Sequence, residues 1–174
     1  MTSSVISASN SMHAPRLERL FRQRMEYVED LGATVGCFLC DYRDSTEDRM
    51  NRILHRSGGA MLLLNAYPYN TGHLMAATTR HVASIEELDV DETREVMQLV
   101  NDAIVALRKA FSPEGFNIGA NLGSAAGAGV PSHFHMHIVP RWNGDTNFMP
   151  VVAGSKVLPQ MLEETYARLE KLFG

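Results

Sequence analysis

Apolar residues recur at helical spacing in three segments of the chain. The clearest segment is 90–111, where an acidic first turn precedes a single apolar face made of Val96, Leu99, Val100, Ala103, Ile104 and Leu107. Residues 14–32 show the same spacing and end at Gly32, and residues 158–173 carry Pro159 in their first turn. Each segment is predicted to form an amphipathic helix.

Short apolar runs bounded by turn residues predict the strands. The runs "GAMLLLNAYP" and "GHLMAATTRH" are joined by "YPYNTG" and predict a hairpin. "GFNIGANLG" and "HFHMHIVPR" predict two more strands, and "TNFMPVVAG" a further one, whereas residues 44–55 predict a short helix or a charged excursion. Strands joined by turns, with helices between and around them, indicate an α+β fold with an antiparallel sheet of about five strands and flanking helices.

The length and composition of the chain favour one globular domain. The chain has 174 residues, of which 45% are hydrophobic and 21% charged, enough to build a buried core. Residues 1–15 are rich in Ser, Thr and Asn and are expected to form a disordered arm. We therefore expect a single domain over residues 16–174.

Charge and hydropathy exclude several classes of partner. A formal net charge of -4 argues against general nucleic-acid binding, which needs a basic surface. No run of about 18 apolar residues is long enough to span a membrane. The first 15 residues have neither the basic nor the apolar region of a signal peptide, so a cytoplasmic location is expected.

The segment "SHFHMHIVPRW" carries three alternating histidines. In a strand His133, His135 and His137 point to one face, while Phe134, Met136 and Ile138 point to the other. The apolar face is expected to join the core and the histidine face to form a site. Neutral imidazole is a nucleophile, a proton carrier and a metal ligand, so three mechanisms stay open: a metal site, an acid–base relay and covalent catalysis.

Two further features could take part in such a site. Cys37 and Cys40, the only cysteines, could be a redox pair, half of a zinc site or two small buried residues, and no β-α-β pattern supports a thioredoxin-like pair. Zinc prefers four N or S ligands, so two histidines would have to come from elsewhere. The glycine-rich loop from Gly123 to Gly129 could fold its amides around a phosphate or simply connect two strands.

These motifs resemble the histidine triad (HIT) superfamily of nucleotide hydrolases and transferases. "HFHMHIV" fits its His-x-His-x-His signature, "NAYPYNTGH" has its Asn-x-x-Pro spacing followed by Gly-His, and "GFNIGANLG" with the loop resembles the segment before the triad. The resemblance covers residues 37–142. The flanking "RMEYV" and "VPRWNGDTNFMPVVAGSKVLPQ" look like the bacterial branch that includes diadenosine tetraphosphate phosphorylase-like members.

The resemblance implies roles for individual residues. The catalytic residues would be His135, as the nucleophile that attacks an α-phosphorus, and His137. The nucleotide would be bound by Asn65 at the ribose, by the fourth histidine of the family, and by amide donors near the triad: Asn65, His73, Asn121, Gly127, Ala128 and Gly129. Relatives often carry Gln and Ser or Thr where this chain has Gly129 and Val130, so backbone amides would carry more of the contact with the leaving group.

Zinc-bearing relatives imply a metal site. They pair the Cys-x-x-Cys with a later histidine and with the first histidine of the triad, positions that match Cys37, Cys40, His81 and His133. Four protein ligands leave no open position, so the zinc would be structural, and a bound His133 could not act as a general acid. Relatives of this size also imply a homodimer, for which the apolar helix over residues 96–107 would offer surface.

The expected function is cleavage of dinucleoside polyphosphates through a covalent nucleotidyl-histidine intermediate. A hydrolase, a phosphorylase that uses phosphate as acceptor and a nucleoside phosphoramidase all stay open, because the residues do not fix the acceptor. A nucleotide-binding sensor without turnover is the alternative from another class, although the intact triad favours the enzyme.

Overall fold

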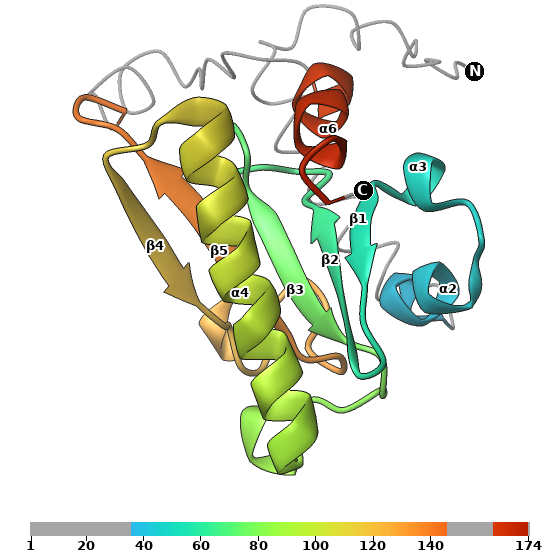
Figure 1. Cartoon of the computed structure of the whole chain (residues 1–174). Coiled ribbons are helices and arrows are strands. Elements are labelled where there is room, and N and C mark those ends of the chain that lie inside the picture. The colour runs from blue at the N-terminus through green and yellow to red at the C-terminus, as the bar shows by residue number, and fades with distance from the viewer. Residues whose placement is uncertain (1–35, 146–161, 174) are drawn as a thin grey trace, which may run out of the picture.

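The computed structural model describes residues 36–145 and 162–173, which build a five-stranded antiparallel sheet (Figure 1). Its strands are β1 (Ile53–Arg56), β2 (Ala60–Leu64), β3 (Leu74–Thr78), β4 (Gly115–Gly119) and β5 (His135–Arg141). They lie in the order β1-β2-β3-β5-β4, and every neighbouring pair is antiparallel. The α+β class, the hairpin of β2 with β3 and the two later strands are confirmed.

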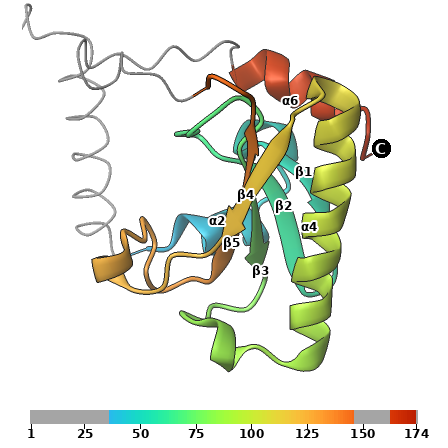
Figure 2. The ribbon, with the colours of Figure 1, turned by 90° about the vertical axis from the view of Figure 1, so that its left-hand side faces the viewer.

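The helices lie on both faces of the sheet, which Figure 2 shows nearly edge-on. α4 (Val90–Phe111) runs along one face, and α2 (Phe38–Asp44) lies on the other. The remaining helices are α3 (Asp48–Asn51), α6 (Leu162–Glu170) and two 3-10 turns, η1 (Ile85–Glu87) and η2 (Ser124–Ala126). α4 matches its predicted span, because a capping box between Asp89 and Glu92 begins it and Ser112, in the left-handed region, ends it.

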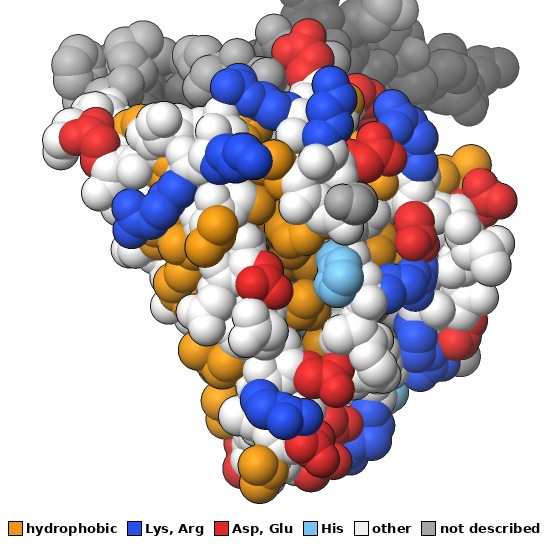
Figure 3. All heavy atoms as spheres, viewed as in Figure 1, with side chains coloured by type: hydrophobic (Ala, Val, Ile, Leu, Met, Phe, Trp, Pro, Cys, Tyr) orange, Lys and Arg blue, Asp and Glu red, His pale blue; other side chains and the backbone are white. Residues whose placement is uncertain are grey.

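The larger core fills the space between α4 and the sheet. The apolar face of α4 packs on the strand residues that point the same way, and the buried set includes Val96, Leu99, Val100, Ala103, Leu107, Leu62, Leu74, Ala76 and Ile138. The apolar face of α4 is therefore buried within the protomer. The periodic apolar stripe offers no spare surface, but Met97 and Val105 beside it are 43% and 66% exposed, and hydrophobic side chains are visible on the face that Figure 3 presents. A dimer through this helix therefore stays a prediction.

The smaller core lies on the opposite face of the sheet, under α2. It contains Leu39, Ile53, Met61, Leu63, Met75 and Ala77, with Phe38 and Tyr42 packed against it. β2 and β3 are buried along their whole length because both of their faces are covered. Two covered faces explain why these strands read as continuous apolar runs and not as alternating ones.

Two elements near the N-terminal side of the domain, α2 and β1, were not predicted from the sequence. Residues 44–55 hold the single turn α3, which agrees with the short helix considered there, and the start of β1, and Arg52 separates the two in the left-handed region (φ 58). Because charged residues surround Ile53, the sequence shows no apolar run from which this short strand could be predicted. Arg56 secures the region, since its guanidinium donates to Asp48 and to the carbonyls of Tyr42 and Arg43 near the end of α2.

Several predictions concern residues outside the described ranges. The arm over residues 1–15, the helix over 14–32, the strand in "TNFMPVVAG" and the start of the last helix at Pro159 all lie there. The domain span of 16–174, the cytoplasmic location and the absence of a nucleic-acid partner stay predictions. Among residues 36–145 and 162–173, no helix combines the length and the apolar character needed to cross a bilayer.

Gly72 lies in the turn between β2 and β3, where it packs closely against α4 and β5. Its φ is +76°, and a Cβ there would lie 2.8 Å from Cδ2 of the fully buried Leu107 and 3.3 Å from Pro140. We expect Gly72→Ala to lower the free energy of unfolding by about 2–4 kcal/mol, because backbone strain and overpacking add. The control is Gly123→Ala, which has the same φ but no atom within 4 Å. Equal losses for both variants in chemical denaturation would contradict the packing argument.

Candidate active site

The pairing of β3 with β5 brings the histidines onto the face of the sheet that lies opposite α4. Met75 pairs with His137 and Ala77 with His135, while Phe134 and Ile138 join the core under α4. The predicted alternation is therefore confirmed for the two later histidines, whose ring centroids lie 4.9 Å apart. His133 precedes the strand, and its ring contacts the cysteines at the start of α2.

Backbone carbonyls fix the tautomers of the first two histidines. Nε2 of His133 lies 2.7 Å from the carbonyl oxygen of Thr78, and Nδ1 of His135 lies 2.8 Å from the carbonyl oxygen of His133. A carbonyl oxygen only accepts, so each of these nitrogens carries the hydrogen. Consequently Nδ1 of His133 and Nε2 of His135 hold free electron pairs.

A second chain of hydrogen bonds fixes the tautomer of His137. The backbone N–H of Tyr69 donates to Nδ1 of His73 at 3.0 Å, so the hydrogen of neutral His73 is on Nε2. That Nε2 lies 3.0 Å from Nδ1 of His137 and donates to it. Neutral His137 therefore carries its own hydrogen on Nε2. The site thus pairs an unprotonated Nε2 on His135 with a protonated Nε2 on His137.

Burial keeps the triad neutral. Desolvation lowers the pKa of His133 and of His135, and it lowers the pKa of His137 to about 4, with a smaller contribution from the neighbouring His135. His73 has no exposed surface, and the ring of Tyr69 stacks over it with centroids 4.8 Å apart. A neutral imidazole is the form that can attack a phosphorus or bind a metal.

The predicted zinc ligands converge. One ligand atom from each of Cys37, Cys40, His81 and His133 lies within 4.8 Å of all the others. Nδ1 of His133 is 3.2 Å from Sγ of Cys37, and Nδ1 of His81 is 3.2 Å from Sγ of Cys40. Tetrahedral zinc separates its S and N ligands by about 3.5 Å, so these distances suit a zinc ion.

The chemistry of this cluster also fits a cation. The tautomer of His133 aims an electron pair at the two sulfurs, as a metal ligand requires. Burial, and next the proximity of Cys37, raise the pKa of the Cys40 thiol, because two thiolates side by side repel each other. A divalent ion would offset that repulsion and favour both thiolates.

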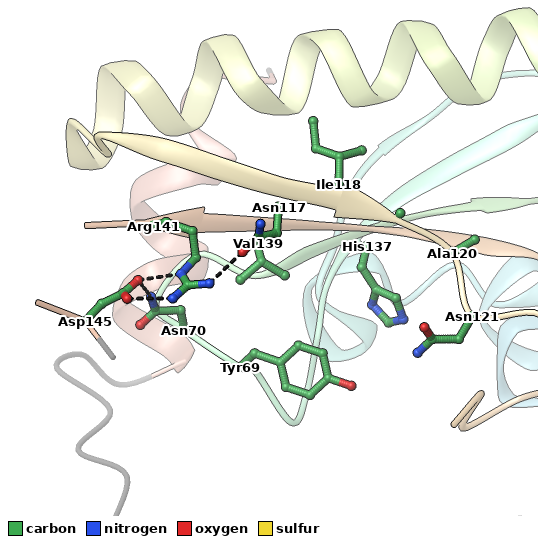
Figure 4. Close-up of a pocket in the computed structure, with 11 residues that line it drawn as sticks. Tyr69, Asn70, Asn117, Ile118, Ala120, Asn121, His137, Val139, Arg141 and Asp145 are labelled. Atoms are coloured by element: carbon green, nitrogen blue, oxygen red, sulfur yellow. Dashed lines mark hydrogen bonds and ion pairs between the residues drawn. The ribbon is translucent and has the colours of Figure 1, made fainter. Parts of the chain in front are cut away.

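A trough of about 600 Å³ extends from His137 along β5 and β4 (Figure 4). One wall of the trough is formed by alternate residues of β5, namely His137, Val139 and Arg141. The other lining residues are Tyr69, Asn70, Asn117, Ile118, Gly119, Ala120, Asn121 and Asp145. Figure 4 shows Asn121 and Tyr69 on either side of the His137 ring, and Ile118 turned towards α4. The predicted contact residue Asn121 therefore lies beside His137, one of the two predicted catalytic residues.

The other predicted nucleotide-binding residues are placed less directly. The side-chain oxygen of Asn65 accepts from the N–H of Tyr67, which is its turn role, and its Nδ2 lies 3.4 Å from the sulfur of Met75 beneath the site. The amides of Gly127 and Ala128 donate to carbonyls within their own loop, and Gly129 is exposed. The phosphate role of Gly127, Ala128 and Gly129 stays a prediction.

Sequence reasoning missed Tyr69, Asn117 and Arg141. Tyr69 lay in a segment interpreted only as a turn, although it precedes His73 by four residues in a tight connection. Arg141 continues the alternation of His135 and His137 along the same strand, so the period of two could have identified it.

Comparisons with known proteins agree with this geometry. A HIT domain model matches residues 47–144, more than half of the chain. An "AP-4-A phosphorylase" of Mycobacterium tuberculosis is 42% identical over 118 residues, which cover 68% of this chain and 60% of that protein. A "Bis(5'-nucleosyl)-tetraphosphatase [asymmetrical]" of Schizosaccharomyces pombe is 30% identical over a region that covers 55% of this chain and 52% of that protein. This chain therefore spans less than two thirds of the length of these two relatives. A zinc-bound histidine triad family protein of Mycobacterium smegmatis shares the fold with a TM-score of 0.63 at 21% identity, over 79% of this chain and 93% of that one.

The pKa of His137 predicts a pH-dependent stability. Its value of about 4 in the folded chain is below the ordinary 6.5, so the unfolded chain binds more protons between these values. The stabilisation is complete above about pH 6.5 and is lost as the pH falls towards 4. We expect the free energy of unfolding of His137→Gln to fall less than that of the wild type between pH 7 and pH 4.5 in chemical denaturation. Parallel pH profiles for the two proteins would show that His137 is not held neutral.

Proposed function

Because this chain belongs to the HIT domain family, we propose that it is an enzyme that cleaves dinucleoside polyphosphates through a nucleotidyl-histidine intermediate on His135. The observation that carries the proposal is the pair of fixed tautomers. The unprotonated Nε2 of His135 would be the nucleophile, and the N–H at Nε2 of neutral His137 would donate a hydrogen bond to the leaving oxygen.

The reaction has two balanced steps. Nε2 of His135 forms a bond to the α-phosphorus, the bond from that phosphorus to its bridging oxygen breaks, and the leaving oxygen departs as an anion that accepts a hydrogen bond from Nε2 of His137. An acceptor then attacks the same phosphorus, the bond from phosphorus to Nε2 of His135 breaks, and any proton of the acceptor passes to water, which restores the neutral imidazole. Water as acceptor yields a nucleoside monophosphate, and inorganic phosphate yields a nucleoside diphosphate.

The names of the relatives support this class of substrate. Both the phosphorylase that is 42% identical and the asymmetrical tetraphosphatase that is 30% identical have names that refer to dinucleoside tetraphosphates. The more similar of the two favours phosphate as the acceptor. Hydrolysis and phosphoramidase activity are the remaining alternatives within the enzyme class, and a sensor without turnover is the alternative outside it.

We further propose that the nucleotide to be transferred is held by the residues that the family resemblance implies. Asn121, which lines the trough beside His137, would donate a hydrogen bond to the α-phosphate. Asn65, which follows β2 next to Met75, would contact the ribose. The amides of the loop over 127–129 would complete the phosphate contacts.

We also propose that Cys37, Cys40, His81 and His133 bind a structural zinc ion. The convergent ligand atoms and the tautomer of His133 support the assignment. The ion would hold α2 and the segment around His81 against the start of the catalytic strand. Since all four ligands come from the protein, the ion takes no part in the reaction itself.

Substitution of the nucleophile tests the enzymatic function. His135→Ala should lower kcat for diadenosine tetraphosphate by more than about 1,000-fold with little change in Tm, because the nucleophile acts in the transition state. Chromatography of the wild-type products identifies the acceptor, since ADP with ATP means phosphorolysis and AMP with ATP means hydrolysis. Near-wild-type turnover by His135→Ala would remove the residue from this role, and a wild type without products under both conditions would favour the sensor.

Metal analysis tests the zinc site. Purified protein should hold about one zinc per chain, and Cys40→Ser or His81→Ala should lose the ion and several degrees of Tm, because the ion binds only the folded state. His55→Ala is the matched control, because His55 is an exposed histidine on β1 that lies outside the cluster. The assignment fails if the wild type contains no stoichiometric metal.

A homodimer is proposed on different grounds from those first expected. β4 is an edge strand that pairs only with β5 among the described residues, and its Ile118 is 44% exposed. A second copy could pair with this edge and cover that side chain. Light scattering should give twice the chain mass, and Ile118→Lys should shift the protein towards the monomer. A wild type that is monomeric at micromolar concentration would contradict the dimer.

A further inference from the structure

The trough described above begins at His137, the histidine proposed to donate a hydrogen bond to the leaving group. His137 lines one end of it, and the pair of Arg141 with Asp145 lies at the other end. Arg141 follows His137 by four residues along β5, a rise of about 13 Å. A leaving group that accepts a hydrogen bond from His137 therefore has its remaining atoms at the entrance of the trough.

The far end of the trough is electrically balanced. Nε and Nη2 of Arg141 donate to the two carboxylate oxygens of Asp145 at 2.6 and 2.7 Å, and this bidentate pair raises the pKa of the arginine. Nη1 of Arg141 donates to Asn117 at 2.6 Å, and Asn70 donates to Asp145 at 2.8 Å. Because its cation is matched by a carboxylate, this end offers little attraction to a polyphosphate chain.

The same lining suits a neutral, flat group with hydrogen-bonding edges. One wall carries the ring of Tyr69, while Asn70, Asn117 and Asn121 contribute side-chain amides, and Val139 contributes an apolar surface. Aromatic rings and amides are the groups that stack on a nucleobase and bond to its edges. Asn117 pairs with Val139 and lies midway along the trough, whereas Gly119 pairs with His137 at its first end.

We propose that this trough is the binding subsite for the second nucleoside, the one that departs with the leaving group. The proposal builds on the proposed function and deepens it, because it makes the distal nucleoside, beyond the phosphate chain, a determinant of specificity. The part of the leaving group nearest His137 is then phosphate, and the part nearest Arg141 is base or ribose.

Two nucleotides that differ only in the distal nucleoside give the test. Diadenosine tetraphosphate and adenosine 5'-tetraphosphate share the adenosine, the α-phosphate and the triad, and their leaving groups are ATP and triphosphate. The wild type should prefer the dinucleoside in kcat/KM. Asn117→Leu should reduce that preference by at least about tenfold, and Asn117→Gln by less, because leucine removes the amide that would bond to the distal base.

The ratio of the two kcat/KM values separates this proposal from general damage, because losses of folding, assembly or chemistry act on both substrates. Asn101→Leu is the matched control, since Asn101 is exposed on α4 and lies outside the lining of the trough. It should keep the wild-type ratio. An Asn117→Leu ratio equal to that of the wild type overturns the subsite while leaving the proposed function intact. A wild type that cleaves neither nucleotide overturns the proposed function and the subsite with it.

Discussion

The antiparallel pairing of β3 with β5 is the constraint on which the site depends. Its register sets Met75 opposite His137 and Ala77 opposite His135, and it puts His73, one residue before β3, within hydrogen-bonding distance of His137. A slip of one residue would turn both catalytic histidines into the core under α4 and bring Phe134 and Ile138 into the site. The apolar face that packs on α4 therefore fixes the register, and the register fixes the catalytic geometry.

Within that frame, each histidine receives its role from the group that accepts or donates at one of its nitrogens. The carbonyl of Thr78 frees Nδ1 of His133 for the cysteines, and the carbonyl of His133 frees Nε2 of His135. Hydrogen bonds through His73 leave a proton on Nε2 of His137. Three identical side chains at a spacing of two thus become a candidate metal ligand, a candidate nucleophile and a hydrogen-bond donor, because their surroundings differ.

The features that the sequence could predict are those that follow from local periodicity or from a family motif. The period of α4 and its acidic first turn predicted its span, and the alternation along β5 predicted which side chains face the site. The cysteines and the two partner histidines of the candidate zinc cluster followed from the family resemblance, and the structure brings their ligand atoms together.

The features that were missed depend on tertiary contacts. β1 is short and surrounded by charges, and its pairing with β2 is visible only once Arg56 is seen to bond the end of α2. The trough likewise joins a turn, two strands and Asp145 from separate parts of the chain. The stripe of α4 shows the same limit, since a periodic apolar stripe predicts burial but does not say against which surface it packs.

The neutrality of the triad has a consequence for how a polyanionic substrate can react there. Burial lowers the pKa of all three histidines, so the site does not attract phosphate through imidazolium charge. In the proposed reaction, attack by neutral His135 creates a positive charge on its ring at the moment when negative charge moves onto the leaving oxygen, which would accept a hydrogen bond from Nε2 of His137. The charges thus develop in opposite senses within a water-poor site, where their interaction is strong. A triad that was charged before the substrate arrived would attract the phosphates of substrate and product alike. In a neutral triad, the attraction between imidazolium and phosphate arises only as the transition state forms.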